Sequence, residues 1–434
     1  MNINFFKLNE LSAADKKKLL RRAEVDIEQL QAQVKPIIQD VKENGDSAIV
    51  KYSKKFDAVD IKPEELKVKD SEFEKASLSL DSLMKEVIKV SAENIRKFHE
   101  SQMPVPIWFT ELSSGVMAGE KITPVNSVGI YVPRGKGSFP SVMLMLCIPA
   151  KIAGVKKIIV CTPPQKDGTV DDASLVAAEI CGVKEIYKAG GVQAIAGMAY
   201  GTETIAKVDK IIGPGSSYVS AAKRLLFGTV DVGLPAGPSE SVILADEKAD
   251  PKIAALDLLI EAEHGPDSTA LLVTHSEKLG QEVKKLLPQL IEKLPENRKN
   301  FCISGFSNYG GIIITESIEE SIDFVNDFAP EHLEVLIEEP MSILGKIENA
   351  GEIMLGKYAP LTISNFSLGP NSTLPTGGFA KTFSAVSVHD FLKRSSIGYL
   401  TKQGYDTLKD VARKFAEYEG FPAHAMAITE RKFD

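Results

Sequence analysis

The chain has 434 residues and a mass of 47.1 kDa; 44% of its residues are hydrophobic and 25% are charged. That length allows two or more packed domains, and the composition is not that of a disordered protein. The formal net charge is −8, which argues against a basic surface for nucleic acid and favours a small-molecule partner.

The cysteines and the longest apolar run indicate the compartment. The cysteines are Cys147, Cys161, Cys181 and Cys302. They show no CxxC spacing and lie mostly in apolar runs, so we expect buried, reduced thiols. The first residues contain no apolar stretch of signal-peptide length, and the run at 142–150 stops at Lys151, well short of a membrane span. We therefore expect a cytoplasmic protein without a membrane segment.

The chain begins with helical periodicity and then changes to an alternating pattern. Residues 12–100 repeat apolar positions at three- and four-residue steps, which predicts amphipathic helices. From Val128 onward, short β-branched runs alternate with helical stretches such as 173–181 and 218–227. The expected strands are 128–132, 157–161, 185–187, 210–212, 241–244, 270–273, 311–315 and 334–337. This alternation predicts an α/β fold with parallel-rich sheets, and the last fifty residues return to helix.

One glycine-rich turn is placed to bind an anion. Residues 213–218 (GPGSSY) follow an expected strand and precede an expected helix. Backbone N–H groups at such a helix start bind phosphate, although a tight turn with a serine cap explains the segment equally well. Residues 129–137 resemble a nucleotide loop but lack the Ser or Thr that would hold magnesium. Without a GxGxxG fingerprint, a dinucleotide would need a less standard site.

Three separated stretches each hold a carboxylate close to a histidine: 261–268 (EAEHGPDS), 329–333 (APEHL) and 419–424 (EGFPAH). With only six histidines in the chain, this suggests one assembled site in an enzyme. Glu261 and His264 lie on one face at the end of a helical run and can supply two metal ligands, although a salt-bridged helix end is the more common meaning.

A histidine from the last stretch and one further oxygen donor would complete a four-ligand shell. That histidine is His424. Glu331 and His332 can serve as paired acid/base groups, although a Glu-His dipeptide alone is weak evidence.

Together these segments resemble the histidinol dehydrogenase family over nearly the whole chain. The matching stretches are 128–133 (VGIYVP), 149–154 (PAKIAG), 189–195 (AGGVQAI), 208–215 (VDKIIGPG), 236–240 (AGPSE), 262–267 (AEHGPD), 329–333 (APEHL) and 374–377 (LPTG). The resemblance implies a zinc-dependent homodimer that oxidises a primary alcohol to a carboxylic acid in two NAD-dependent steps through an enclosed aldehyde.

The resemblance also implies two Rossmann-like domains with an incomplete dinucleotide motif, and terminal arms that swap across the dimer. We expect an N-terminal helical arm at 1–26 and a C-terminal helical dimerisation arm at 387–434. The main α/β domain, with the metal and catalytic residues, is expected at 27–130 and 241–386. An inserted Rossmann-like NAD domain is expected at 131–240.

Roles carried over by position form one site. The resemblance implies that Glu331 activates water against the aldehyde and that His332 takes the alcohol proton. The implied zinc ligands are Glu261, His264, Asn365 and His424. The implied NAD contacts are Tyr131, Gln193 and Ser216. The implied substrate contacts are Ser239, Glu261, His264, His332, Asn365, Ser372, Glu419 and His424.

The chain departs from the family at several of these positions. Glu261 and Asn365 stand where the family has Gln and Asp, an exchange that keeps one anionic and one carbonyl donor for a divalent metal. Ser372 stands where the family has a substrate-contacting His, Ser216 where it has an Asn, and Arg134 where it has a Gly.

These departures leave three readings of the function open. L-Histidinol is the default substrate. A paralogue that oxidises another small polar or anionic alcohol, such as a sulfonated diol, is the first alternative. A non-catalytic binding homologue that has lost its metal is the second.

Overall fold

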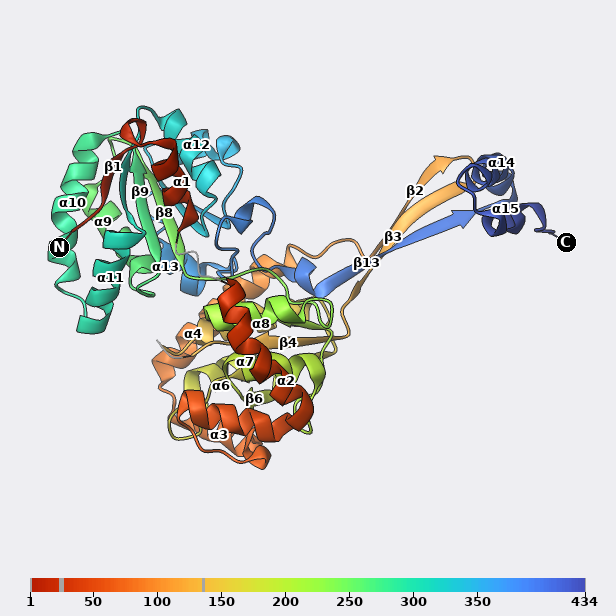
Figure 1. Cartoon of the computed structure of the whole chain (residues 1–434), viewed down its shortest axis with the longest axis horizontal. Helices are drawn as coiled ribbons and strands as arrows, with labels where there is room; N and C mark the ends of the chain where they lie inside the picture. The colour runs from red at the N-terminus through yellow and green to blue at the C-terminus, as the bar shows by residue number, and fades with distance from the viewer. Residues whose placement is uncertain (1, 23–26, 135–136, 434) are drawn as a thin grey trace. The chain divides into compact units, whose positions relative to one another are not determined.

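The structure is a computed structural model that describes residues 2–22, 27–134 and 137–433, and it divides into two compact units (Figure 1). The larger unit comprises Met1–Gln102 and Val125–Phe391, and the second comprises Met103–Pro124 and Leu392–Asp434. Each is an assembly of distant segments, because the second unit interrupts the larger one in sequence.

A six-stranded parallel sheet forms one part of the larger unit. Its strands, in spatial order, are β1 (Phe5–Lys7), β10 (Gly311–Ile314), β9 (Thr269–Thr274), β8 (Glu240–Ala245), β11 (His332–Leu336) and β12 (Glu352–Leu355). Helices α9 (Pro251–Ala262), α10 (Glu277–Ile291) and α11 (Glu296–Asn308) contribute to one apolar cluster against it, and α12 (Ile318–Phe328) to a second, joined by α1 (Ala13–Arg21). The central strands β8, β9 and β11 are buried along their whole length, because both of their faces are covered.

A four-stranded parallel sheet forms the other part. Its order is β6 (Ile186–Lys188), β5 (Lys157–Thr162), β4 (Ser127–Tyr131) and β7 (Lys210–Ile212). Helices α2 (Ile27–Tyr52), α7 (Gly191–Tyr200) and α8 (Ser217–Leu226) share a buried apolar cluster with it. Helices α3 (Asp70–Ser79), α4 (Ser82–Glu100), α5 (Pro140–Ile152) and α6 (Asp172–Ile180) contact one another in the same part of the unit.

The larger unit also contains short helical segments. The turn α13 covers Leu361–Ile363, and π-helical turns cover Ser53–Asp57 and Ser364–Leu368. The 3₁₀ turns are Leu8–Glu10, Pro63–Glu65, Pro340–Ser342, Leu344–Lys346, Phe379–Lys381 and Val388–Phe391.

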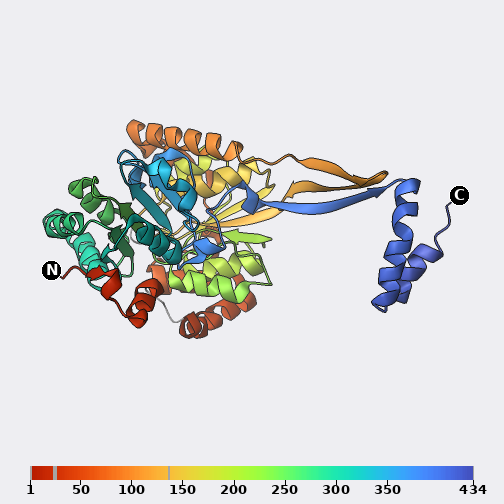
Figure 2. The same ribbon diagram turned by 90° about the horizontal axis from the view of Figure 1, so that it is seen from above.

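The second unit is an antiparallel ribbon followed by two helices (Figure 2). Strand β3 (Val116–Pro124) lies between β2 (Ile107–Ser113) and β13 (Leu392–Leu400), and α14 (Lys402–Tyr418) packs against α15 (Pro422–Thr429). Many large apolar side chains of this unit are exposed, among them Ile107, Trp108, Phe109, Leu112, Tyr399, Val411, Phe415, Tyr418, Phe421 and Met426. The unit therefore does not bury a core of its own.

Much of the sequence-based expectation is confirmed. The fold is α/β with parallel-rich sheets, each expected strand overlaps an observed one, and all four cysteines are free and buried. No helix among the described residues is long and apolar enough to cross a membrane.

Several strands were not anticipated, and two terminal expectations need correction. The helical pattern expected over the last fifty residues is wrong for Leu392–Leu400, which form β13 through backbone pairing with β3. In the expected N-terminal helical arm, Phe5–Lys7 instead add β1 to the edge of the six-stranded sheet by pairing with β10. The expected domain boundary at residue 130 falls inside β4, and α2 packs with the four-stranded sheet.

Candidate active site

The predicted catalytic and metal-binding residues of the larger unit meet at the amino-terminal edge of the six-stranded sheet. Because its strands are parallel, the first residues of β8, β11 and β12 lie at the same edge. Glu331 and His332 stand at the start of β11, where His332 is in register with Ser241 and Glu352. Helix α9 follows β8 and runs back across the sheet, which brings Glu261 and His264 to this edge. Asn365 comes from the π-helical turn Ser364–Leu368.

His332 is the centre of this group, buried among carboxylates. Its Nδ1 lies 2.9 Å from Glu352 Oε2, while its Nε2 lies 3.9 Å from Glu261 Oε1 and 3.9 Å from Glu331 Oε1. Burial lowers the pKa of the imidazole, but the charge of Glu261 and the hydrogen bond to Glu352 outweigh it and raise the pKa to about 10. The ring therefore favours the charged form in this arrangement.

Glu331 is held by a backbone donor. Its Oε2 accepts a hydrogen bond of 2.9 Å from the backbone N–H of Glu240. Burial raises the pKa of Glu331 well above its usual range, partly offset by the charge of His332 and reinforced by Glu261. A carboxyl group with a raised pKa, beside a histidine, is suited to exchange a proton near neutral pH.

The predicted metal donors of the larger unit contact one another. Glu261 is 1% exposed, its Oε2 forms an ion pair with His264 Nδ1, and its Oε1 accepts a 3.0 Å hydrogen bond from Asn365 Nδ2. Burial alone would raise the pKa of Glu261, but His264 and His332 lower it to about 2. Burial likewise lowers the pKa of His264, but Glu261 more than offsets this and raises it. The salt-bridged helix end that the sequence allowed is therefore present.

This donor set suits a divalent cation, but only with additional ligands. A carboxylate, an imidazole and an amide carbonyl are common ligands of such ions. Within residues 2–22, 27–134 and 137–433, no three His, Cys, Asp or Glu side chains are grouped so that they could hold a metal. A cation bound here would thus need the Asn365 carbonyl oxygen and a further ligand.

Two predicted residues belong to the second unit. Glu419 is the C-cap residue that follows α14, and His424 lies in α15 with its ring 5.3 Å from that of Phe421, measured between centroids. Both are exposed. Their place in the site remains a prediction.

The remaining predicted substrate contacts are serines near the same sheet edge. Ser239 directly precedes β8 and accepts a 3.0 Å hydrogen bond from Thr269 N at its carbonyl. Ser372 Oγ donates to the carbonyl of Ser364 at 3.3 Å, which links it to the turn that carries Asn365.

The predicted NAD contacts gather at the carboxyl edge of the four-stranded sheet. Tyr131 is the last residue of β4, and its hydroxyl accepts a 2.9 Å hydrogen bond from Gly191 N. Gln193 is 1% exposed, and its Oε1 has no hydrogen-bond partner among the described residues. Ser216 is the N-cap residue of α8, as the serine-cap alternative expects, but its side chain makes no capping hydrogen bond. An unpaired buried oxygen and an uncapped helix start fit a polar, anionic cofactor.

Arg134 points toward the same part of the unit. Its guanidinium donates to the carbonyl of Pro164 at 3.4 Å and to Gln165 Oε1 at 3.5 Å. The glycine-rich comparison at 129–137 falls partly on residues 135–136, which lie outside the described residues.

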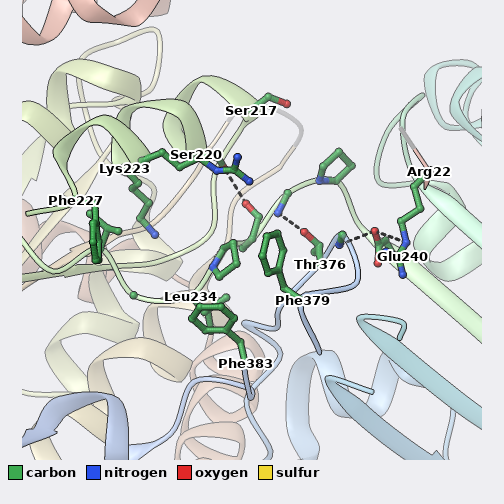
Figure 3. A pocket seen from close by; sticks show the side chains of 18 of the residues that line it. Arg22, Ser217, Ser220, Lys223, Phe227, Leu234, Glu240, Thr376, Phe379 and Phe383 are labelled. Atoms are coloured by element: carbon green, nitrogen blue, oxygen red, sulfur yellow. Dashed lines mark hydrogen bonds and ion pairs between the residues drawn. The ribbon is translucent and has the colours of Figure 1, made fainter. Parts of the chain in front are cut away.

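A cavity of about 1000 Å³ adjoins the site on the side of Glu240 (Figure 3). It lies between α8, residues 231–238 and residues 376–383. Arg22 and Glu240 form one wall, with Arg22 Nε 3.0 Å from Glu240 Oε1. None of the predicted site residues lines it, as far as the structure describes the chain.

Sequence reasoning assigned no role to several polar residues around Glu331 and His332. Glu352 contacts His332 and Glu240 contacts Glu331, while Ser364 contacts Glu352 and Arg22 contacts Glu240. Glu240 ends the AGPSE stretch at 236–240, which was the only available signal. The others stand in segments without a motif.

Comparisons with known proteins agree on one family. The histidinol dehydrogenase family model matches residues 20–432. The chain is 54% identical to a histidinol dehydrogenase from Synechocystis sp. over 426 residues, covering 98% of both chains. It is 49% identical to a histidinol dehydrogenase homolog from Rhizobium meliloti over 429 residues, covering 99% of this chain and 94% of the other. The crystal structure of histidinol dehydrogenase from Elizabethkingia anophelis superposes with a TM-score of 0.93 at 37% identity, covering 98% and 97% of the two chains.

Proposed function

The chain belongs to the histidinol dehydrogenase family, and on that premise we propose that it oxidises L-histidinol to L-histidine in two NAD⁺-dependent steps. Membership makes it an oxidoreductase that acts on an alcohol. The observation that carries the proposal is the position of His332 Nε2, which lies 3.9 Å from both Glu261 and Glu331. One imidazole nitrogen thus stands between a metal-ligand candidate and a second acid/base group.

The proposed chemistry assigns one proton transfer to each residue of the pair. In the first step the alcohol loses a hydride from carbon and a proton from oxygen, and His332 takes that proton at Nε2. In the second step a water adds to the aldehyde, and Glu331 takes a proton from that water before the second hydride leaves. NAD⁺, when bound, accepts one hydride in each step and leaves as NADH.

The proposed metal ligands are Glu261, His264, Asn365 and His424. The carboxylate–imidazole pair and the nearby amide support zinc or another divalent ion. When bound, the ion would anchor a polar atom of the substrate and offset the Glu261 charge, which lowers the His332 pKa toward that of a neutral base.

The proposed NAD⁺ site uses Tyr131, Gln193 and Ser216. The unpaired Gln193 oxygen and the free helix start at Ser216 support it. We assign NAD⁺ binding to the inserted segment 131–240, and the metal and catalytic roles mainly to 241–386. Ser239, Ser372 and Glu419 are the further proposed substrate contacts.

We also propose that the protein acts as a homodimer in the cytoplasm. The support for a dimer is the second unit, whose exposed aromatic and aliphatic side chains need a cover. The support for the compartment is the set of four free, buried cysteines. Light scattering should give twice the chain mass of 47.1 kDa.

The direct test is NADH formation with purified protein, Zn²⁺, NAD⁺ and L-histidinol. Two NADH should form for each L-histidine. If histidinol gives no NADH while a sulfonated diol or another anionic alcohol does, the chemistry stands and the substrate assignment fails. If no alcohol of the panel gives NADH and no metal is bound, the protein is the non-catalytic homologue and the proposal is wrong.

The paralogue is the second candidate function, because one position favours it. Ser372 offers no imidazole to a substrate, and some relatives, including that from Rhizobium meliloti, carry the name homolog. An anionic alcohol would then replace histidinol in the same two steps.

A further inference from the structure

Glu352 is a buried carboxylate to which neither the motifs nor the proposed reaction gives a role. It is the first residue of β12 and 9% exposed. Its backbone N–H donates to the Glu331 carbonyl at 3.0 Å, and its position in the sheet is directly beside His332. Its side chain therefore lies on the face of the sheet that carries the catalytic imidazole.

Both oxygens of this carboxylate are used. Oε2 lies 2.9 Å from His332 Nδ1, and Oε1 accepts a hydrogen bond from the Ser364 hydroxyl. Because Nδ1 donates to Glu352, the ring cannot rotate freely, and Nε2 is the nitrogen that faces Glu261 and Glu331. A carboxylate in this position fixes both the orientation and the tautomer of an imidazole.

Ser364 extends this connection to the proposed metal site. The next residue is Asn365, whose amide donates to Glu261 at 3.0 Å. Ser372 donates to the Ser364 carbonyl at 3.3 Å. Glu352 therefore connects the proposed base His332 to the turn that carries Asn365, a proposed metal ligand. Ser372, a proposed substrate contact, is hydrogen-bonded to the first residue of that turn.

We propose that Glu352 is a positioning residue, which holds the His332 ring with Nε2 toward the substrate and holds the Ser364–Leu368 turn against the same site. This proposal rests on the proposed function, since the assignment of His332 as the base gives the ring orientation its purpose. Glu352 does not touch the reacting atoms and acts only through His332 and Ser364.

The first experiment separates charge, orientation and general stability. Glu352→Leu removes the acceptor and should lower kcat by about 10- to 100-fold, with the KM for NAD⁺ unchanged. Glu352→Gln keeps an acceptor for Nδ1 and should lose less, while Ser364→Ala should lose only a few-fold. Glu334→Gln is the matched control, because it removes another fully buried carboxyl from the same part of the sheet, two residues after His332, and should keep kcat. Equal losses in Glu352→Leu and Glu334→Gln would overturn the proposal.

The second experiment asks whether the effect passes through His332. In a His332→Asn background, followed by single-turnover measurement, Glu352→Leu should cost almost nothing further, since residues that act as a unit are not additive. A merely structural role predicts the full loss again. That additive result would exclude positioning of the base.

A third experiment does not depend on the substrate. Imidazole ¹⁵N–¹H spectra of the wild type should show a hydrogen-bonded Nδ1–H resonance that is absent from His332→Asn. Glu352→Leu should lose or shift that resonance, and Glu334→Gln should retain it. If it is absent from the wild type, or unchanged in Glu352→Leu, the positioning role is wrong. If histidinol is not oxidised but the resonance behaves as described, the proposed substrate fails while the contact stands.

Discussion

Arg22 and Glu240 form a buried ion pair beside Glu331, with Arg22 Nε 3.0 Å from Glu240 Oε1. Gly377 N donates to the same oxygen at 2.9 Å, and Glu240 N donates to Glu331 Oε2 at 2.9 Å. Burial raises the pKa of Glu240 to about 7, although Arg22 opposes this. The N-terminal segment thus supports the position of Glu331 from the side of the cavity in Figure 3.

Removing the cation of this pair should destabilise the protein. Arg22→Met leaves Glu240 buried without its partner, and breaking such a pair costs about 3–5 kcal/mol. The free energy of unfolding, measured by urea titration at neutral pH, should fall by that order. The double variant Arg22→Met/Glu240→Gln should recover part of the loss, because no uncompensated charge remains. A single variant as stable as the wild type would show that the ion pair contributes nothing.

Two buried carboxyl groups, Glu334 and Asp257, predict that the stability of the fold depends on pH. Glu334 on β11 and Asp257 on α9 are both buried, and burial together with the charge of Asp257 raises the Glu334 pKa to about 9. Because the folded-state pKa lies above the ordinary value of 4.5, the proton stabilises the fold at low pH. That contribution is lost as pH rises toward 9, by at most about 1.4 kcal/mol per pH unit.

Chemical denaturation between pH 5 and pH 9 should reveal this slope. Glu334→Gln, which keeps a donor for Asp257, should flatten it without changing kcat at neutral pH. A slope of unchanged size in Glu334→Gln would assign the pH dependence to other groups.

Variants of the proposed catalytic residues Glu331 and His332 should affect the two half-reactions differently. Glu331→Gln should slow the oxidation of supplied aldehyde about 10²- to 10⁴-fold, more than it slows the alcohol step, because only the former needs an activated water. His332→Asn should damage the alcohol step at least as severely. Stopped-flow measurement of NADH from each starting compound checks both. Small and equal losses in both halves would contradict the assigned roles.

The strands with continuous apolar runs could be predicted from the sequence. Strands that form only because their backbone pairs with a neighbouring strand could not. Strands such as β8 are buried on both faces, and a short, continuous run of β-branched and apolar residues is the pattern expected of such a strand. Leu392–Leu400 contains Lys393, Arg394 and two serines, so its sequence shows no strand pattern. It is a strand because its backbone pairs with β3. Strand β12 has only four residues and begins with the charged Glu352, so its sequence could not be distinguished from that of a surface loop.

The part of the candidate site that lies in recognisable motifs could be predicted from the sequence. Glu261, His264, Glu331 and His332 stand in recognisable stretches, and the structure brings them together. The ion pair of Arg22 with Glu240 joins positions far apart in the chain, so no local spacing announces it. Such supporting contacts become visible only when the sheet edge is assembled.

The proposed metal ligands Glu261 and Asn365 predict that a second substitution can rescue the first. Glu261→Gln should weaken Zn²⁺ binding about tenfold or more, since it removes the carboxylate from the proposed donor set. Adding Asn365→Asp should restore most of the affinity and of the NADH formation, because the set regains one anionic oxygen. Metal content after dialysis against a chelator, followed by Zn²⁺ titration calorimetry, measures the effect apart from activity. An equally weak double variant would show that the two positions do not share one ion.

The substrate preference should depend on the position of Ser372. Its hydroxyl contacts only the Ser364 carbonyl among the hydrogen bonds of the described residues, so an imidazole there would face the site without breaking a buried network. If an anionic alcohol is the natural substrate, Ser372→His should lower its kcat/KM and raise that of histidinol, each by about tenfold, since one polar contact is worth roughly 1.4 kcal/mol. If histidinol is the natural substrate, the wild type already turns it over efficiently and the variant gains little. Steady-state kinetics on both alcohols, with Ser372→Ala as the control for loss of the hydroxyl alone, decides between these outcomes, because only the imidazole can shift the preference in opposite directions for the two substrates.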